Sequence, residues 1–187
     1  MILRKTILIL VLNLSTSPLF AADYRIDPAH SFVTFRIQHL GYSWLHGQFR
    51  DISGRFSYDS DNPEANSITV RIDPASLDTN HEERDKHLRS ADFLDVTNFK
   101  EARFESLQYT GTDAEGIMEG NLTLHGVTRL IKIKVTKVGE GKDPWQGYRA
   151  GFHGIFILTR SDFGMNYNLG RDSETVEIEL NIEGIRQ

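Results

Sequence analysis

The sequence predicts an all-β protein in which eight antiparallel strands close into a single barrel, with one short helical insertion around 80–94. Two observations lead to this fold class. Apolar residues recur mainly at every second position, which is typical of strands with one buried face. Only one segment departs from that alternation, and closure into a barrel removes the exposed edges that a sheet of so many strands would otherwise have.

The first 21 residues have the layout of a secretory signal peptide. Two basic residues precede the apolar run 6–14, and the small residues Ala21 and Ala22 stand where cleavage is expected. This run is shorter than the roughly 20 residues that a membrane-spanning helix needs. We therefore expect an exported protein without a permanent membrane anchor, whose mature domain covers 22–187.

The composition limits the classes of function that this protein can have. The 187 residues carry a formal net charge of −5 and include no cysteine. An acidic chain without a cluster of lysine and arginine is a poor partner for nucleic acid or anionic lipid. The absence of cysteine excludes disulfides, cysteine nucleophiles and cysteine metal ligands, so the apolar core must supply the stability.

The alternation of apolar and polar residues locates the strands. It is clearest near the C-terminus, where Val176, Ile178 and Leu180 alternate with glutamate and asparagine. The His125-Gly126 pair predicts a two-residue hairpin. The expected strands cover 31–39, 47–58, 67–73, 101–109, 116–124, 127–137, 148–159 and 174–184, with bulges or tight corners at the internal glycines Gly54, Gly151 and Gly154.

The segment 80–89 reads as the helix. Asn80 and Glu83 resemble a capping box, and two favourable pairs of opposite charge lie four residues apart. A second turn around Phe93 then returns the chain to the sheet. His81 and His87 are six positions apart and point to different sides of a helix, so a solvated helix face is favoured over a metal site.

No motif indicates catalysis. The chain has no G-x-S-x-G elbow and no glycine-rich phosphate loop, and Asp162-Phe163-Gly164 stands without the other kinase signatures. The remaining histidines lack ligand spacing and are interpreted as structural. We expect a non-enzyme without a metal. The residues alone leave open whether side chains fill the barrel or surround a ligand.

Four stretches, in order, resemble the signatures of the YceI-like family, with similarity from about Tyr24 to the C-terminus. The chain departs from the family pattern at Phe99-Lys100, where an aromatic-proline pair is common, and near Leu130, where a proline is common. The four stretches are DPAHSFVTFRIQHLGYSWLHGQF at 27–49, RDKHLRSADFLD at 84–95, LTLHGVT at 122–128 and RSDFGMNYNLG at 160–170.

The resemblance implies a lipocalin-like, extended eight-stranded barrel with an apolar tunnel that binds a polyisoprenoid or a similar long-chain amphiphile. It favours a hollow barrel over a solid one and a periplasmic carrier without catalytic activity. The only bound group expected is a polyisoprenoid or an isoprenoid quinone, and a homodimer is left open. Two alternatives remain: a redox accessory that handles quinone head groups, and a stress-responsive structural protein with a solid barrel.

Alternation and the resemblance together select candidate ligand contacts. The helix at 80–89 is expected to cap or brace the barrel. The apolar candidates for the tunnel are Phe35, Ile37, Phe104, Leu122 and Phe156, with Trp44 and Phe93 at its mouth; the polar candidates at the mouth are His39, Arg84 and His87.

Overall fold

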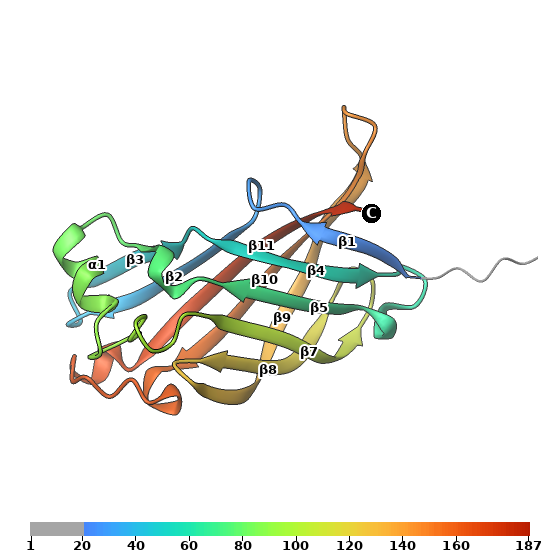
Figure 1. The fold of residues 1–187 in the computed structure, drawn as a ribbon. Coiled ribbons are helices and arrows are strands. Elements are labelled where there is room, and N and C mark those ends of the chain that lie inside the picture. The colour runs from blue at the N-terminus through green and yellow to red at the C-terminus, as the bar shows by residue number, and fades with distance from the viewer. Residues whose placement is uncertain (1–20) are drawn as a thin grey trace, which may run out of the picture.

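The computed structural model describes residues 21–187 and shows a barrel of long strands with one α-helix at one end (Figure 1). The expected signal peptide lies almost wholly outside the described residues. The strands are β1 (Ala22–Ile26), β2 (Phe32–His39), β3 (Ser43–Phe49), β4 (Ile52–Tyr58), β5 (Ser67–Ile72), β6 (Leu77–Asp78), β7 (Ala102–Gly111), β8 (Glu115–Leu124), β9 (Val127–Lys142), β10 (Tyr148–Thr159) and β11 (Thr175–Arg186), and the helix is α1 (Glu82–Leu88). Among the described residues, no helix is long and apolar enough to cross a bilayer.

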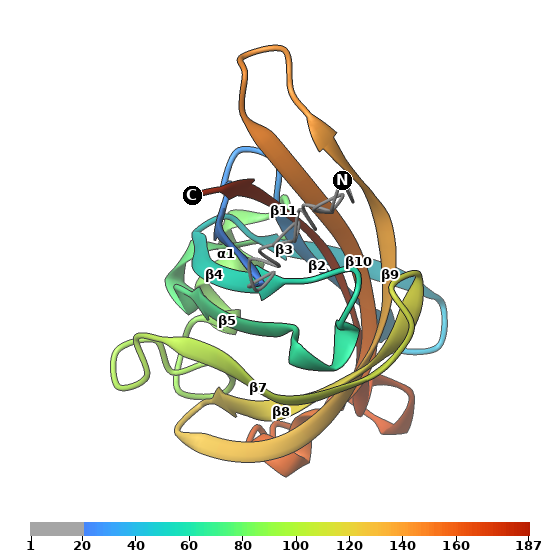
Figure 2. The same cartoon turned by 90° about the vertical axis from the view of Figure 1, so that its right-hand side faces the viewer.

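The barrel closes through the first and last strands. The ring of antiparallel strands runs β1-β4-β5-β7-β8-β9-β10-β11 and returns to β1, where Tyr24 lies opposite Arg186. β2, β3 and β6 extend the sheet from the other half of β11. Figure 2 shows the strands arranged around a common axis. The closed, eight-stranded antiparallel barrel predicted from the sequence is confirmed.

One expected segment differs from the structure, and the first strand was not expected. The segment 47–58 is not one strand, because β3 ends at Phe49 and β4 begins at Ile52. Between them the backbone N–H groups of Arg50 and Asp51 donate to the side chain of Ser76, at 3.1 and 3.0 Å, rather than to a strand. β1 was not expected, because its five residues are too few to show a clear alternation.

Glycines permit three local features of the sheet. The two-residue hairpin is confirmed, since His125 and Gly126 both have positive φ values, 51° and 73°, between the paired Leu124 and Val127. The register of β10 against β9 shifts next to Gly151, as a bulge requires. At Gly54 the register continues without a shift; a Cβ there would lie 2.2 Å from a carbonyl oxygen of β5, so the close approach of two strands requires glycine.

Helix α1 begins one residue later than a capping box at Asn80 would place it. The N-cap is His81, whose Nδ1 accepts a hydrogen bond of 3.2 Å from the backbone N–H of Arg84. Asp85 is buried and accepts from the backbone N–H of Thr79 at 2.9 Å and from the Thr79 hydroxyl. This buried carboxylate fixes α1 against the end of β6.

Candidate ligand-binding site

The barrel encloses a cavity of about 480 Å³. Side chains from every strand except β1 line it, together with residues of α1 and of the segment after β10. Alternation explains the apolar wall: on β11, for example, Val176, Ile178 and Leu180 face the cavity, whereas the intervening Glu177 and Glu179 form ion pairs with Arg36 and His153. The barrel is therefore hollow, and its interior is predominantly apolar.

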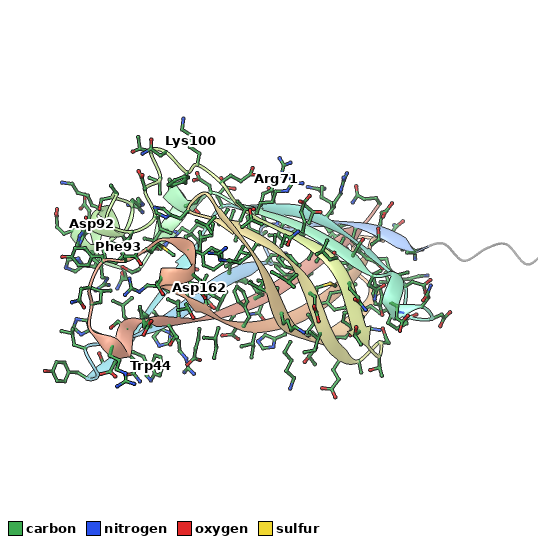
Figure 3. The ribbon with its side chains drawn as sticks, turned by 90° about the horizontal axis from the view of Figure 1, so that it is seen from below. Trp44, Arg71, Asp92, Phe93, Lys100 and Asp162 are labelled. Carbon is green, nitrogen blue, oxygen red and sulfur yellow. The ribbon has the colours of Figure 1, made fainter. Side chains whose placement is uncertain are left out.

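Most of the apolar residues selected from the sequence line this cavity: Phe35, Ile37, Phe93, Phe104, Leu122 and Phe156. Trp44 does not, which corrects its expected place at the mouth. Its neighbour Leu45 faces inward, so Trp44 lies on the outer surface with 43% of its area exposed (Figure 3). There the guanidinium of Arg36 lies 4.5 Å from the centroid of the Trp44 ring.

The three polar candidates, His39, Arg84 and His87, line the cavity at the α1 end. The guanidinium of Arg84 is held by Thr79, through a bond of 2.7 Å to Oγ1 and one of 2.5 Å to the carbonyl oxygen. This contact gives Arg84 a structural role beside α1. His39 lies at the end of β2 and is exposed.

His87 belongs to an aromatic group at the same end. Its ring lies edge-on to Phe93 and to Tyr167, with centroids 5.0 and 5.2 Å apart. Its Nε2 lies 2.9 Å from Oδ2 of Asp92, and Figure 3 shows Asp92 and Phe93 beside each other at this end of the barrel. His87 therefore has one ring face among apolar groups and one nitrogen bound to a carboxylate.

Arg160 is a cavity residue that the sequence did not reveal. Only 8% of it is exposed, and burial lowers the pKa of its guanidinium. Its Nε donates to the carbonyl of Ser173 at 2.8 Å, and its Nη1 donates to those of Met165 and Tyr167 at 3.3 and 3.2 Å. Within residues 21–187 no ion pair includes Arg160. The α1 end thus carries a buried cation whose hydrogen bonds to described residues all go to carbonyl groups.

The opposite end of the cavity also carries a polar group. Lys137 Nζ lies 2.7 Å from Asp113 Oδ2 and 2.9 Å from Glu140 Oε1, and the Tyr58 hydroxyl donates to Asp113. Burial by itself would lower the pKa of Lys137, but the bonds to Asp113, Tyr58 and Glu140 outweigh it and raise that pKa. Lys137 therefore stays charged. The sequence could have placed it on the cavity wall, because it follows two residues after Val135 in the inward-facing series Ile131, Ile133 and Val135.

A third polar cluster lies outside the cavity. Asp27, His30 and Glu183 place one potential metal-ligand atom each within 4.8 Å of the others. Arg149 already supplies positive charge there, because its Nη1 donates to Asp27 Oδ2 at 2.7 Å and to Glu183. Hydrogen bonds from Arg149 and His30 lower the pKa of Asp27 to about 2.

A closed, eight-stranded antiparallel barrel around an apolar cavity is the architecture of the lipocalin-like barrels. Within this class the chain belongs to the YceI-like domain family, whose model matches residues 24–184. A UPF0312 protein of Ectopseudomonas mendocina is 55% identical over 171 residues, covering 89% of each chain. A UPF0312 protein of Azotobacter vinelandii is 50% identical, covering 99% of this chain and all of its own.

Solved structures share the fold. Burkholderia cenocepacia BcnA superposes with a TM-score of 0.76 at 21% identity, over 84% of this chain and 98% of that one. The YceI protein of Campylobacter jejuni gives a TM-score of 0.72 at 26% identity, over 81% and 90% of the two chains. A domain from Saccharophagus degradans described as polyisoprenoid-binding gives 0.67 at 17% identity, over 90% and all of the two chains.

Proposed function

We propose that this protein is a periplasmic carrier or sequestering protein for a polyisoprenoid or a similar long-chain amphiphile, and that it does not act as an enzyme. The observation that carries the proposal is the apolar cavity of about 480 Å³ inside the barrel. The name of the domain from Saccharophagus degradans, which shares the fold, supports the same ligand class. The sequence pattern of residues 1–21, which is typical of a signal peptide, supports export.

Apolar burial supplies the affinity in this proposal. An isoprenoid chain presents only methyl, methylene and alkene groups, and each methylene removed from water contributes about 0.8 kcal/mol. The walls formed by Phe35, Phe104 and Phe156 offer that environment without directional demands. The polar end of the ligand would lie at the α1 end, where His39, His87 and the buried Arg160 offer hydrogen-bond donors.

Native mass spectrometry of protein purified from its own periplasm, with extraction and analysis of the lipid, tests the proposal. We expect a bound long-chain lipid, and a mature N-terminus that follows Ala21 or Ala22. Leu180→Trp, which fills the cavity, should abolish lipid recovery. Leu107→Trp, on the 64% exposed Leu107, is the matched control and should keep it. Wild-type protein that is always empty and also refuses added polyprenyl lipid would overturn the proposal.

A redox accessory for isoprenoid quinones is the second candidate. His39 and His87 lie in the same end of the cavity, where a quinone head could accept hydrogen bonds. Any electron transfer would belong to the bound quinone. Purified protein that oxidises an added quinol with an external electron acceptor, and loses this activity in His87→Ala, would favour this candidate. The third alternative, a structural protein with a solid barrel, does not agree with the cavity inside the barrel.

A further inference from the structure

The barrel wall is incomplete between β9 and β10. The ladder of these strands ends at the pair Ile155 and Lys134, although both strands continue toward the α1 end. Continuing the same register would place Phe156, Ile157, Leu158 and Thr159 opposite Ile133, Lys132, Ile131 and Leu130, and none of these four pairs forms. Figure 1 shows the two strands diverging here. We call this opening the β9–β10 slot.

Side chains alone separate the slot from the ligand cavity. The slot forms a second hollow of about 290 Å³, and two of its lining residues, Ile131 and Leu158, also line the large cavity. Its far end is bridged by the 3-10 helix Arg160–Phe163, where Arg129 Nε donates to the carbonyl of Asp162 at 3.1 Å. Opening the slot therefore breaks no β9–β10 hydrogen bond, and it requires the side chains shared by the two hollows, Ile131 and Leu158, to move.

The outer rim of the slot is apolar and basic. Leu130, Ile155 and Ile157 are 58%, 45% and 67% exposed, which is high for large aliphatic side chains grouped on neighbouring strands. Lys132 and Lys134 are exposed on β9, where they alternate with the inward-facing Ile131, Ile133 and Val135. Lys132 pairs with Glu119, whereas no ion pair between described residues includes Lys134. Arg129, Lys132 and Lys134 thus make the β9 side of the rim basic. On the β10 side, Glu177 and Glu179 lie opposite Ile157 and Ile155 and form ion pairs with Arg36 and His153.

We propose that this rim docks on a bilayer that contains anionic lipid, and that the β9–β10 slot is the entrance through which the hydrocarbon chain passes into the cavity. The second half of this inference rests on the proposed function. Leu130 and Ile157 outside the wall and Ile131 and Leu158 within it form a continuous apolar path. Lysines beside exposed aliphatic side chains suit the boundary between phosphate head groups and acyl chains.

A hydrocarbon chain that enters through the slot passes different groups from a chain that enters at either end of the cavity. An apolar chain entering at the α1 end would pass His39, Arg84 and the buried Arg160, and at the other end it would pass Lys137 with Asp113. Each of these charged groups would have to lose water or hydrogen bonds as the chain passes. Ile131 and Leu158 form the floor of the slot, whereas the charged residues that line it, Arg129, Lys132 and Asp162, are already exposed to solvent. A hydrocarbon chain that passes over this floor therefore displaces no buried charged group.

The test combines two variants with two matched controls. Ile157→Asp and Lys134→Glu change the rim, whereas Leu107→Asp and Lys142→Glu make the same changes at exposed residues away from it. Docking is measured by flotation with vesicles of phosphatidylglycerol and phosphatidylcholine in equal parts. Uptake is measured with a fluorescent polyprenol that is supplied either in those vesicles or in detergent.

We expect the rim variants to bind the vesicles less and to take up polyprenol from them about tenfold more slowly than the controls. Uptake from detergent should be the same in all four variants, because the cavity is unchanged. Vesicle binding and uptake equal to those of the controls would overturn the inference. If no polyprenol enters from detergent, the proposed function fails, and the flotation result still decides whether the rim docks on the bilayer.

Discussion

Phe156 and Ile26 are both large apolar residues of the barrel, but they have different neighbours. Phe156 lines the cavity, whereas Ile26 is 1% exposed and packs within the core on β1. Ile26→Ala should cost about 2–5 kcal/mol of unfolding free energy, as for a core cavity, and leave lipid affinity unchanged. Phe156→Ala should cost the ligand-free protein less and weaken lipid binding. Thermal melts with and without added polyprenol measure both effects.

Phe35 and Phe104 extend this comparison, because both also line the cavity. Alanine at either position should behave as it does at Phe156. A large loss of stability without ligand, combined with unchanged lipid affinity at all three positions, would show that these residues form a core and that the assignment of the binding wall is wrong.

Asp27 makes the free energy of unfolding depend on pH in the acid range. Its pKa is about 2 in the folded protein and 3.8 in an unfolded chain, because Arg149 and His30 bind the carboxylate. The resulting stabilisation is complete above about pH 4 and is lost as the pH falls toward 2. It amounts to about 2 kcal/mol. Urea unfolding across this range should therefore show a weaker decline in Asp27→Asn than in wild type.

Asp61→Asn is the control for that measurement. Asp61 is exposed, and no ion pair among residues 21–187 includes it. Its substitution should leave the decline as in wild type. An identical acid dependence in wild type and Asp27→Asn would show that the bond to Arg149 does not contribute to stability.

The candidate site was predictable from the sequence where several alternating residues agree. Phe35 and Ile37 belong to a strand whose pattern fixes their direction, so their inward orientation followed. Trp44 stands at the beginning of β3, where too few residues alternate to fix the face, and its predicted place at the mouth was wrong. Arg160 could not be found, because a buried cation bound by carbonyls of three other residues depends on the folded chain.

The buried carboxylate of Asp85 holds helix α1 against the end of β6. Asp85→Ala would leave the buried backbone N–H of Thr79 without its acceptor and should cost about 1–3 kcal/mol. The exposed Lys86→Ala on the same helix should change stability by less than about 0.5 kcal/mol. Hydrogen exchange of residues 79–88 should accelerate only in Asp85→Ala. Equal protection in both variants would contradict the anchoring role.

At the scale of elements, long strands were predicted better than short or broken ones. The alternation identified β10 and β11 nearly to their ends, because many residues share one face. β1 has five residues, and the division of 47–58 into two strands depends on Ser76, which lies far along the chain. The β9–β10 slot was equally hidden, since the sequences of both strands remain regular where their pairing stops.

The whole cavity sets a limit on ligand length. Each added isoprene unit should raise affinity while it can still be buried, and affinity should level off once the cavity is full. A series of polyprenols of increasing length, measured by displacement of one fluorescent lipid, would give the curve. Affinity that is independent of length, or that passes through one sharp optimum, would contradict binding by apolar burial in this cavity.

Closure of the ring through β1 and β11 brings the two ends of the described chain together, and the backbone N–H of Gln187 donates to the carbonyl of Asp23 at 2.9 Å. β11 is also the shared partner of β10, β2 and β1. Until the ribosome has released this last strand, three strands lack an edge to pair with, so a nascent chain cannot complete the barrel. Closure of the barrel is therefore a late event in folding, which waits for β11.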